Sequence, residues 1–464
     1  MLTELRIKNF KAWKDTGDVR IAPLTVIFGA NSSGKSSLGH LLLALKQTTL
    51  LSDRKRALHL GDESTAIDLG TFSDCIFGHD LKSNLEFSLS WQPPSPIIVR
   101  NSLERGASYS GNTLTLKSTI RVGKGDQPEV SSINYRLSQD RSVILSANHG
   151  RADTGVVTLE TAPLKLVKAT GRVWPLEPPE KFYRFSDRTL ARFQNADFLA
   201  SFALETERVL GHLYYLGPLR SPPRRIYQWS GEIPSDVGPS GEFSIAAVLA
   251  ADSEGRRLNR RAKQPLLGFS AFIGKWLKDL GVIYSFEVHP VAKGRKEFEV
   301  LIKTHASSPE VKLTDVGFGV SQVLPALVES FYAPPNSIVW MEQPEIHLHP
   351  QVQAELADVF ISAIQARENG KSRNVQLIIE SHSEHLLTRL QRRVAEGLID
   401  PKDVAVYFSH HGRESAELEP LRMDLYGDIE NWPNNFFGDE TADIRARTIS
   451  AMKRKIQERE SASK

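Results

Sequence analysis

The stretch GANSSGKSS, residues 29–37, constrains the fold of this chain more than any other feature. Gly29, Gly34, Lys35 and Ser36 have the spacing of a phosphate-binding loop, in which glycines let backbone N–H groups wrap around phosphates. The lysine reaches the β and γ oxygens, and the serine hydroxyl is a ligand for Mg²⁺. An apolar run at residues 24–28 precedes the loop, and apolar residues at helical spacing follow it over residues 36–51. We therefore expect a strand–loop–helix unit that binds ATP and Mg²⁺, with the positive end of the helix facing the phosphates.

A second stretch, IVWMEQPEIHLHP at residues 338–350, resembles the metal-binding strand of an ATPase with one residue changed. The apolar run ends at Glu342, which we expect to hold the water shell of the magnesium ion; a core strand ending in a surface glutamate is the alternative. The next position, where a catalytic carboxylate is expected, holds Gln343. An amide orients a water molecule but cannot accept its proton, so hydrolysis is expected to be slow.

Three explanations of Gln343 stay open. Glu-Gln-Pro-Glu is a natural arrangement in which Glu345 or His382 supports the attacking water; the protein is a slow switch whose ATP-bound dimer is the active state; or a native glutamate has been replaced. We favour the first two together.

The order of segments predicts the α/β class. Strand-like runs at residues 2–7 and 24–28 come first, and short alternating segments separated by turn residues follow between residues 84 and 173. A helix is predicted over residues 190–210 and a hairpin over residues 284–304. Helices and strands then alternate over residues 321–409, which indicates a mixed or mostly parallel sheet flanked by helices.

We predict four parts in this chain. They are an N-terminal half of an ATPase core (residues 1–80), an insertion that is β-rich and then partly helical (81–310), a C-terminal half of the core (311–412) and a small extension (413–464).

Composition excludes several classes. With 40% hydrophobic and 24% charged residues, the chain is globular, and no apolar run is long enough to cross a membrane. Cys75 is the one cysteine, so neither a disulfide framework nor a cysteine zinc site is expected, and we expect a cytoplasmic protein. A net charge of +3 does not itself indicate a nucleic-acid partner. Basic clusters at residues 220–225 and 256–263 form either a solvated face or a phosphate-binding surface.

The order of the phosphate loop, a long insertion, GFGVSQ (317–322), WMEQPEIHLHP (340–350) and IIESHSEHLL (378–387) resembles the ABC-type ATPases of the RecF, SMC and OLD group. The ending YGDIENWPNNFFGDE (426–440) resembles a bacterial subgroup with an uncharacterised C-terminal domain. These likenesses cover about the first 75 and the last 150 residues. They imply the fold of an ABC ATPase head.

The resemblance also implies roles for individual residues. Glu342 corresponds to the Walker B acid, His382 to the switch histidine near the γ-phosphate, and Lys11 to a residue flanking the nucleotide. Residues 346–350 correspond to the D-loop, which favours a loop role over a metal pair for the two histidines there. The Walker A residues are Gly29, Asn31, Ser33, Gly34, Lys35, Ser36 and Ser37. The signature residues, which begin a helix that meets the γ-phosphate bound by the opposite subunit, are Gly317, Gly319, Ser321 and Gln322.

Two departures from the family pattern stand out. The signature is FGVSQ in place of Leu-Ser-Gly-Gly, and no glutamine loop is recognised; DLGTFSDCIFG (68–78) falls near its place without a glutamine.

The resemblance finally implies partners. An ATP-sandwich homodimer is expected, in which each active site combines Walker residues of one subunit with the signature of the other. Such dimers could assemble further into a higher oligomer. The 82 residues after His382 are too few for the nuclease domain of OLD proteins. We therefore expect a sensor or scaffold ATPase of anti-phage defence that acts with a separate effector, a nuclease or toxin. The alternatives are a RecF-like DNA-binding ATPase of repair or recombination, and a catalytically quiet ATP-binding assembly protein.

Overall fold

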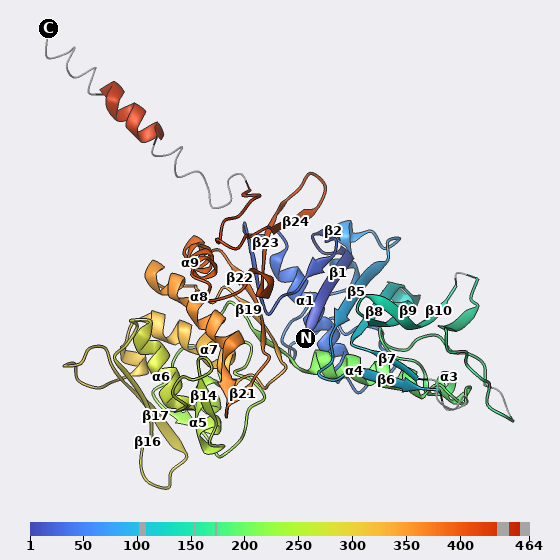
Figure 1. Cartoon of the computed structure of the whole chain (residues 1–464), viewed down its shortest axis with the longest axis horizontal. Helices are drawn as coiled ribbons and strands as arrows, with labels where there is room; N and C mark the ends of the chain where they lie inside the picture. The colour runs from blue at the N-terminus through green and yellow to red at the C-terminus, as the bar shows by residue number, and fades with distance from the viewer. Residues whose placement is uncertain (102–107, 153, 172–173, 434–444, 455–464) are drawn as a thin grey trace.

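A computed structural model covers the chain and describes residues 1–101, 108–152, 154–171, 174–433 and 445–454. Two large sheets dominate it, one mostly parallel and one antiparallel (Figure 1).

The mostly parallel sheet has the order β12-β19-β22-β4-β23-β24. The first five strands are parallel, and β24 runs antiparallel to β23. Its central strands are nearly continuous apolar runs, as expected where helices cover both faces of a sheet. The bounds are β12 (Leu213–Leu216), β19 (Ile338–Glu342), β22 (Gln376–Ser381), β4 (Leu24–Gly29), β23 (Val404–His411) and β24 (Ala416–Leu421).

The two faces of this sheet belong to two hydrophobic cores, because successive side chains of a strand point to opposite faces. On β19, Val339 and Met341 join the core that contains α5 to α9, whereas Ile338 and Trp340 join the core that contains α1. The helices are α1 (Lys35–Leu50), α5 (Ser244–Ser253), α6 (Phe269–Asp279), α7 (Phe318–Tyr332), α8 (Pro350–Gln365) and α9 (Glu384–Ala395).

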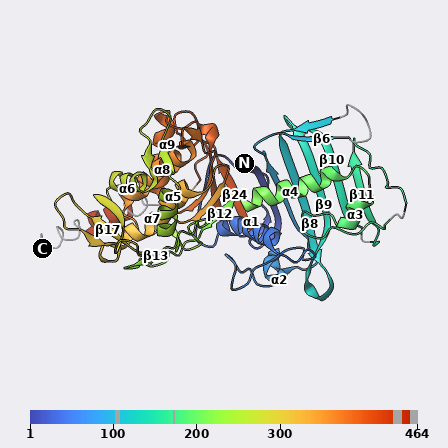
Figure 2. The ribbon, with the colours of Figure 1, turned by 90° about the horizontal axis from the view of Figure 1, so that it is seen from below.

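The antiparallel sheet has the order β11-β10-β9-β8-β5-β1-β2, and β3 pairs with β1. Helix α4 (Asp197–Gly211) lies across one of its faces (Figure 2), where Phe198 and Phe202 share a core with sheet residues. The strands are β1 (Leu2–Phe10), β2 (Trp13–Asp15), β3 (Val19–Arg20), β5 (Leu85–Trp91), β8 (Thr113–Val122), β9 (Pro128–Gln139), β10 (Ser142–Arg151) and β11 (Val157–Ala162).

The remaining elements are short. The helical ones are α2 (Phe72–Cys75), α3 (Asp187–Ala191), η1 (Phe77–His79), η2 (Lys124–Asp126), η3 (Leu313–Asp315) and η4 (Pro401–Asp403). The strands are β6 (Ile97–Arg100), β7 (Ser108–Gly111), β13 (Tyr227–Gln228), β14 (Arg257–Asn259), β15 (Leu267–Gly268), β16 (Ser285–Pro290), β17 (Glu297–Lys303), β18 (Val311–Lys312), β20 (Arg367–Glu368) and β21 (Lys371–Ser372). Residues 445–454 are helical.

Most of the expected elements are present: the strands at both ends of the β-rich segment, the hairpin of β16 and β17, and the alternation from α7 to β23. The helix predicted over residues 190–210 is wrong in part, because α3 ends at Ala191 and α4 begins at Asp197. Between them, the Asn195 side chain accepts a hydrogen bond from Val167 N (2.9 Å) and donates one to Lys165 O (3.0 Å). This side chain ties the connection to a crossing segment, so the local helical pattern is interrupted.

The pairing of β1 with β5 bears on the predicted parts. It joins the first strand of the chain to the β-rich segment, so the proposed boundary at residue 80 is crossed by one continuous sheet. All the boundaries stay predictions, and the extension at 413–464 includes residues 434–444 and 455–464, which lie outside the described ranges. No helix in the described part of the chain combines the length and apolar character needed to cross a membrane.

Gly39 offers a test of how α1 packs on the sheet. A Cβ at this position would lie 2.3 Å from the Trp340 ring, so Gly39→Ala is expected to lower the free energy of unfolding by about 1–3 kcal/mol through overpacking. This loss would occur although alanine favours helix by about 1 kcal/mol over glycine. Urea denaturation should be compared with that of Gly211→Ala in α4, where a Cβ meets nothing within 4 Å. Equal stability of the two variants would contradict the packing described.

Candidate nucleotide-binding site

The phosphate loop connects β4 to α1 at the carboxyl end of the sheet. Gly34 forms the N-cap of α1 with φ +92°, no side chain caps the helix, and its first turn holds no acidic residue. In this 16-residue helix the N–H groups of Lys35 and Ser36 have no hydrogen-bond partner among the described residues and are placed to bind an anion. Gly29 is required as well, because a Cβ there would lie 2.1 Å from the Ser409 carbonyl oxygen.

Lys35 lies over the loop. Its Nζ donates hydrogen bonds to Gly29 O (3.0 Å) and Ala30 O (2.7 Å). Burial lowers the pKa of this ammonium group, and nearby carboxylates, Glu380 foremost, oppose the shift. A phosphate group would supply the strong anionic partner that the backbone carbonyls replace only in part.

Two carboxylates lie beside the loop. Glu342 and Glu380 occupy the same register position at the ends of the neighbouring strands β19 and β22, and both are buried. Ser36 Oγ donates to Glu380 Oε2 (2.9 Å), and the Tyr215 hydroxyl donates to Glu342 Oε1 (2.9 Å). One hydroxyl and two carboxylates form the hard oxygen donor set that Mg²⁺ prefers. Across the described residues, no cluster of three or more His, Cys, Asp or Glu side chains forms a metal site by itself.

Glu380 was missed by sequence reasoning, although IIES carries the same signal as IVWME, an acid at the end of an apolar strand. Its second oxygen, Oε1, accepts a hydrogen bond from the Trp340 indole (3.1 Å). Burial raises the pKa of Glu380, and the charge of Glu342 raises it further. Glu380 therefore holds a proton more tightly than an isolated carboxylate does.

The residues assigned to the attacking water lie together on the same edge. Gln343 has a left-handed backbone (φ +46°), and its N–H donates to Glu380 O (2.9 Å). Glu345 Oε1 accepts a hydrogen bond from the backbone N–H of His382 (2.7 Å), whereas its Oε2 is buried without a partner among the described residues. Burial raises the pKa of Glu345. Burial and then Lys35 lower that of His382, and the Gly29 backbone partly offsets the shift.

Arg220 was not predicted as a site residue. It follows β12, and its Nη2 donates to the Glu342 carbonyl oxygen (3.3 Å). Its Nε and Nη1 are buried and find no hydrogen-bond partner in the described ranges. Burial lowers its pKa to about 10, so it stays cationic at neutral pH. A buried guanidinium with free donors beside a phosphate loop is suited to an anionic ligand.

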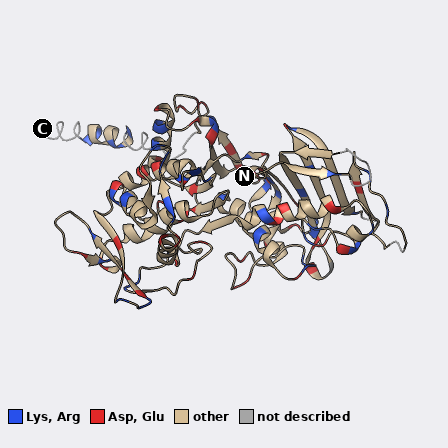
Figure 3. Ribbon diagram, turned by 60° about the horizontal axis from the view of Figure 1, so that its bottom comes forward, with Lys and Arg blue, Asp and Glu red and all other residues tan. Residues whose placement is uncertain are grey.

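The two basic clusters divide between exposed side chains, which include Arg224, Arg257 and Lys263, and side chains held by ion pairs. Lys and Arg are interspersed with Asp and Glu along the ribbon (Figure 3). Beyond Arg220, several cluster members are held by internal ion pairs, which are Arg225 with Asp315 (2.8 Å), Arg256 with Glu368 (2.7 Å) and Arg260 with Asp279 (2.6 Å).

The signature residues lie at the start of α7, as expected. Gly317 forms its N-cap without a side-chain cap, and Phe318 is 68% exposed. The Phe318 ring meets the ring of His347 edge-to-face at 6.4 Å. Ser321 is turned inward, because its hydroxyl donates to Phe318 O (2.8 Å), and Gln322 is buried.

The start of α7 is thus placed against the predicted D-loop. A Cβ on Gly319 would lie 3.7 Å from Leu348 Cδ2. In the part of the chain that the structure describes, no hydrogen bond or ring contact joins the first turn of α7 to the phosphate loop.

Lys11, predicted to flank the nucleotide, makes no hydrogen bond to the phosphate loop among the described residues. Lys11 N donates to Cys75 O (2.7 Å), while the neighbouring Trp13 indole donates to Gly34 O (3.0 Å). The segment 68–78 contains α2, whose last residue, Cys75, accepts the hydrogen bond from Lys11 N. Ser33 O accepts from Ser409 Oγ (2.7 Å), and the Ser33 hydroxyl is buried without a partner among the described residues.

Three further predicted residues complete the picture. Asn31 is exposed, and Ser37 N donates to Gly34 O (3.0 Å) within α1. His349 caps α8, where its Nδ1 accepts from Gln351 N (3.3 Å), so the two D-loop histidines have loop and cap roles.

Comparison with known families gives two matches. Residues 270–387 match the family described as AAA ATPase domain, and residues 399–446 match a family described as a protein of unknown function (DUF3696). No curated protein matches the chain.

Solved structures give distant matches. An SMC head bound to the C-winged helix domain of ScpA has 11% identity and a TM-score of 0.40, covering 91% of this chain and 98% of that chain. The SMC head domain from Thermotoga maritima has 10% identity and a TM-score of 0.36, covering 91% and 99%. An Smc head domain with an extended coiled coil, bound to the C-terminal domain of ScpA derived from Pyrococcus furiosus, has 10% identity and a TM-score of 0.41, covering 90% and 96%. Likeness at this level assigns no function or partner.

The ATPase family match therefore rests on residues 270–387, which contain α7, β19 and β22. The predicted α/β fold class is confirmed: a mixed sheet flanked by helices, with an antiparallel β-rich segment and a partly helical middle.

The raised pKa of Glu380 predicts that Mg-ATP binding releases protons, because a carboxylate must lose its proton to serve a metal. Calorimetry of Mg-ATP binding in two buffers of different ionisation enthalpy should show up to about one more proton released by the wild type than by Glu380→Gln. The difference should shrink as pH rises through the raised pKa, since the site is then already deprotonated. Equal proton release by the two proteins at every pH would contradict the paired-carboxylate site.

Proposed function

We propose that this protein is an ABC-type ATPase that binds Mg-ATP at the phosphate loop and forms an ATP-sandwich homodimer. One observation carries the proposal: a helix with a free N-terminus, Lys35 and Ser36 lie against two buried carboxylates from adjacent strand ends. The groups that would bind the phosphates and the groups that would bind Mg²⁺ thus lie together at one edge of the parallel sheet.

The residues divide the work of binding. The free N–H groups at the start of α1 hold the phosphates, and Lys35 turns from the loop carbonyls to the β and γ oxygens. Ser36, with Glu342 or Glu380, would hold Mg²⁺, which when bound neutralises charge on the β and γ oxygens. Tyr215 keeps the Glu342 carboxylate oriented, and Trp340 does the same for Glu380.

Hydrolysis is proposed to be slow. The Gln343 amide orients the attacking water but cannot take its proton. Glu345 bonds the backbone of His382 and fixes the loop that carries the imidazole, and its raised pKa fits a carboxyl group that accepts a proton. Arg220 has free donors for charge that develops on the transferred phosphoryl group.

The dimer is supported by the start of α7. Its N-terminus is uncapped, its first apolar side chain is exposed, and it makes no described contact with the phosphate loop of its own chain. A second copy that brings this helix end to the γ-phosphate would satisfy both its free N–H groups and Phe318.

The biological role is proposed from the resemblance of the motifs. It is a sensor or scaffold ATPase in the bacterial cytoplasm that acts with a separate effector, a nuclease or toxin, in anti-phage defence. The RecF-like alternative is less favoured because a net charge of +3 does not itself indicate a nucleic-acid partner, and three of the eight Lys and Arg side chains in the basic clusters are held by ion pairs. Because the Gln343 amide cannot accept a proton from water, a catalytically quiet ATP-binding assembly protein is the second candidate.

Turnover separates the two candidates. The wild type should hydrolyse Mg-ATP slowly, and Gln343→Glu should change the rate little if Glu345 and His382 already serve the water. Lys35→Ala is the control and should remove turnover and nucleotide binding together. Wild-type turnover at the background rate, with Gln343→Glu faster than that background by on the order of a hundredfold, would contradict slow hydrolysis. It would favour the quiet ATP-binding protein.

A further inference from the structure

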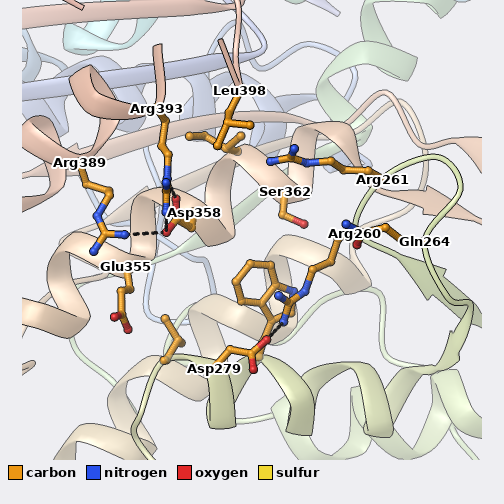
Figure 4. A pocket seen from close by; sticks show the side chains of 13 residues that line it. Arg260, Arg261, Gln264, Asp279, Glu355, Asp358, Ser362, Arg389, Arg393 and Leu398 are labelled. Carbon is orange, nitrogen blue, oxygen red and sulfur yellow. Dashed lines mark hydrogen bonds and ion pairs between the residues drawn. The ribbon is translucent and has the colours of Figure 1, made fainter. Parts of the chain in front are cut away.

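A second cavity lies away from the nucleotide site, between α6, α8, α9 and the segment 260–264. Its volume is about 480 Å³, and it is lined by charged and polar side chains (Figure 4). The range of about 300–1,000 Å³ is typical of pockets for small molecules.

Four arginines line the cavity, from α9 and from the segment 260–264. On α9, Arg389 (3.1 Å) and Arg393 (2.8 Å) both bond one carboxylate, that of Asp358 on α8. Arg393 also pairs with Glu396, so these two guanidinium groups are matched by two carboxylates and are fixed in position at the cavity wall.

The other two arginines differ from each other. Arg260 pairs with Asp279 (2.6 Å), and its guanidinium stacks on the Trp276 ring with 3.5 Å to the centroid. The Arg261 side chain has neither an ion pair nor a hydrogen bond among the described residues, and Figure 4 shows it beside Ser362. Arg261 is therefore the cation most available to a ligand.

Three polar atoms in the same lining are buried without a hydrogen-bond partner in the described ranges. They are Ser362 Oγ, Trp276 Nε1 and Glu355 Oε2. Ser362 and Trp276 are each only 5% exposed, so neither residue is solvated by bulk water. Buried polar groups in folded proteins are almost always bonded, so three exceptions around one cavity indicate a missing partner.

We propose that this cavity binds a small phosphorylated ligand that carries hydroxyl groups, such as a sugar phosphate. The phosphate accepts hydrogen bonds from Arg261 and Arg389, which offer planar, charged donors. A hydroxyl group donates to Glu355 and accepts from Ser362 or Trp276. A ligand with both features would supply partners to the unpaired Arg261 guanidinium and to the unbonded polar atoms together.

A purely structural role of the cavity-lining arginines explains fewer of these observations. Ion pairs that clamp α9 to α8 explain Arg389, Arg393 and Asp358. They leave Arg261 without a function and the buried polar atoms without partners.

Titration calorimetry of the full chain with ribose 5-phosphate tests the proposal. The wild type should bind, and Arg261→Ala should weaken binding by about tenfold or more through loss of charge-assisted hydrogen bonds. Arg392→Ala is the matched control, because this side chain is on α9, is exposed and pairs with Glu396 outside the cavity lining. Lys35→Ala removes the phosphate loop as a competing site and should leave the affinity unchanged.

Several outcomes would overturn the proposal. They are no binding by the wild type, binding lost in Lys35→Ala but kept in Arg261→Ala, or equal weakening by Arg392→Ala. Equal affinity for inorganic phosphate would overturn the assigned role of the hydroxyl-binding atoms. Arg261 makes no described side-chain bond, so its variant should keep the wild-type circular dichroism spectrum.

Discussion

The register of three parallel strands is the constraint on which the rest of the site depends. β22 lies between β4 and β19, and its pairing with β19 sets Glu380 beside Glu342. Its pairing with β4 sets the same residue next to the phosphate loop. A slip of β22 by one residue would turn Glu380 to the other face of the sheet and remove it from Glu342 and Ser36.

The packing of α1 against the sheet places Ser36 beside the carboxylates that this register brings together. Gly39 lets the helix approach the Trp340 ring closely, and that ring in turn donates to Glu380. The approach of α1 to the sheet, the orientation of the carboxylate and the position of Ser36 are therefore linked. On the other side of the loop, the Trp13 indole binds Gly34 O and connects the antiparallel sheet to the start of α1.

The buried charged groups of the site are energetically unfavourable without a ligand. Glu342 and Glu380 lie side by side in a buried place, and burial, then the charge of Glu342, raise the pKa of Glu380. Lys35 is bound to loop carbonyls, and Arg220 keeps free donors beside Glu342. Binding of a polyanion with a divalent cation would give each of these groups an opposite charge.

Local patterns allowed much of this to be predicted from the sequence. The phosphate loop, the strand before Glu342 and the alternation after residue 321 each depend on residues close together in the chain. Glu380, Tyr215 and Arg220 were missed because their importance arises from strand register and from a crossover between distant segments. The pairing of β1 with β5 and the break near Asn195 are likewise set by long-range contacts, which a local pattern does not contain.

The central claim is that each nucleotide site is completed by the α7 N-terminus of a second copy. Two single variants, Lys35→Ala and Gly319→Asp, test it by complementation. The first removes the phosphate contact, and the second places a negative charge at the helix end that would meet the γ-phosphate.

The decisive measurement is ATP turnover of each variant alone and of an equal mixture of the two. Each alone should be inactive, and random pairing should restore about a quarter of wild-type turnover, because half of the dimers then contain one intact site. A mixture as inactive as its components, with mixed dimers shown by native mass spectrometry, would contradict a site shared between subunits.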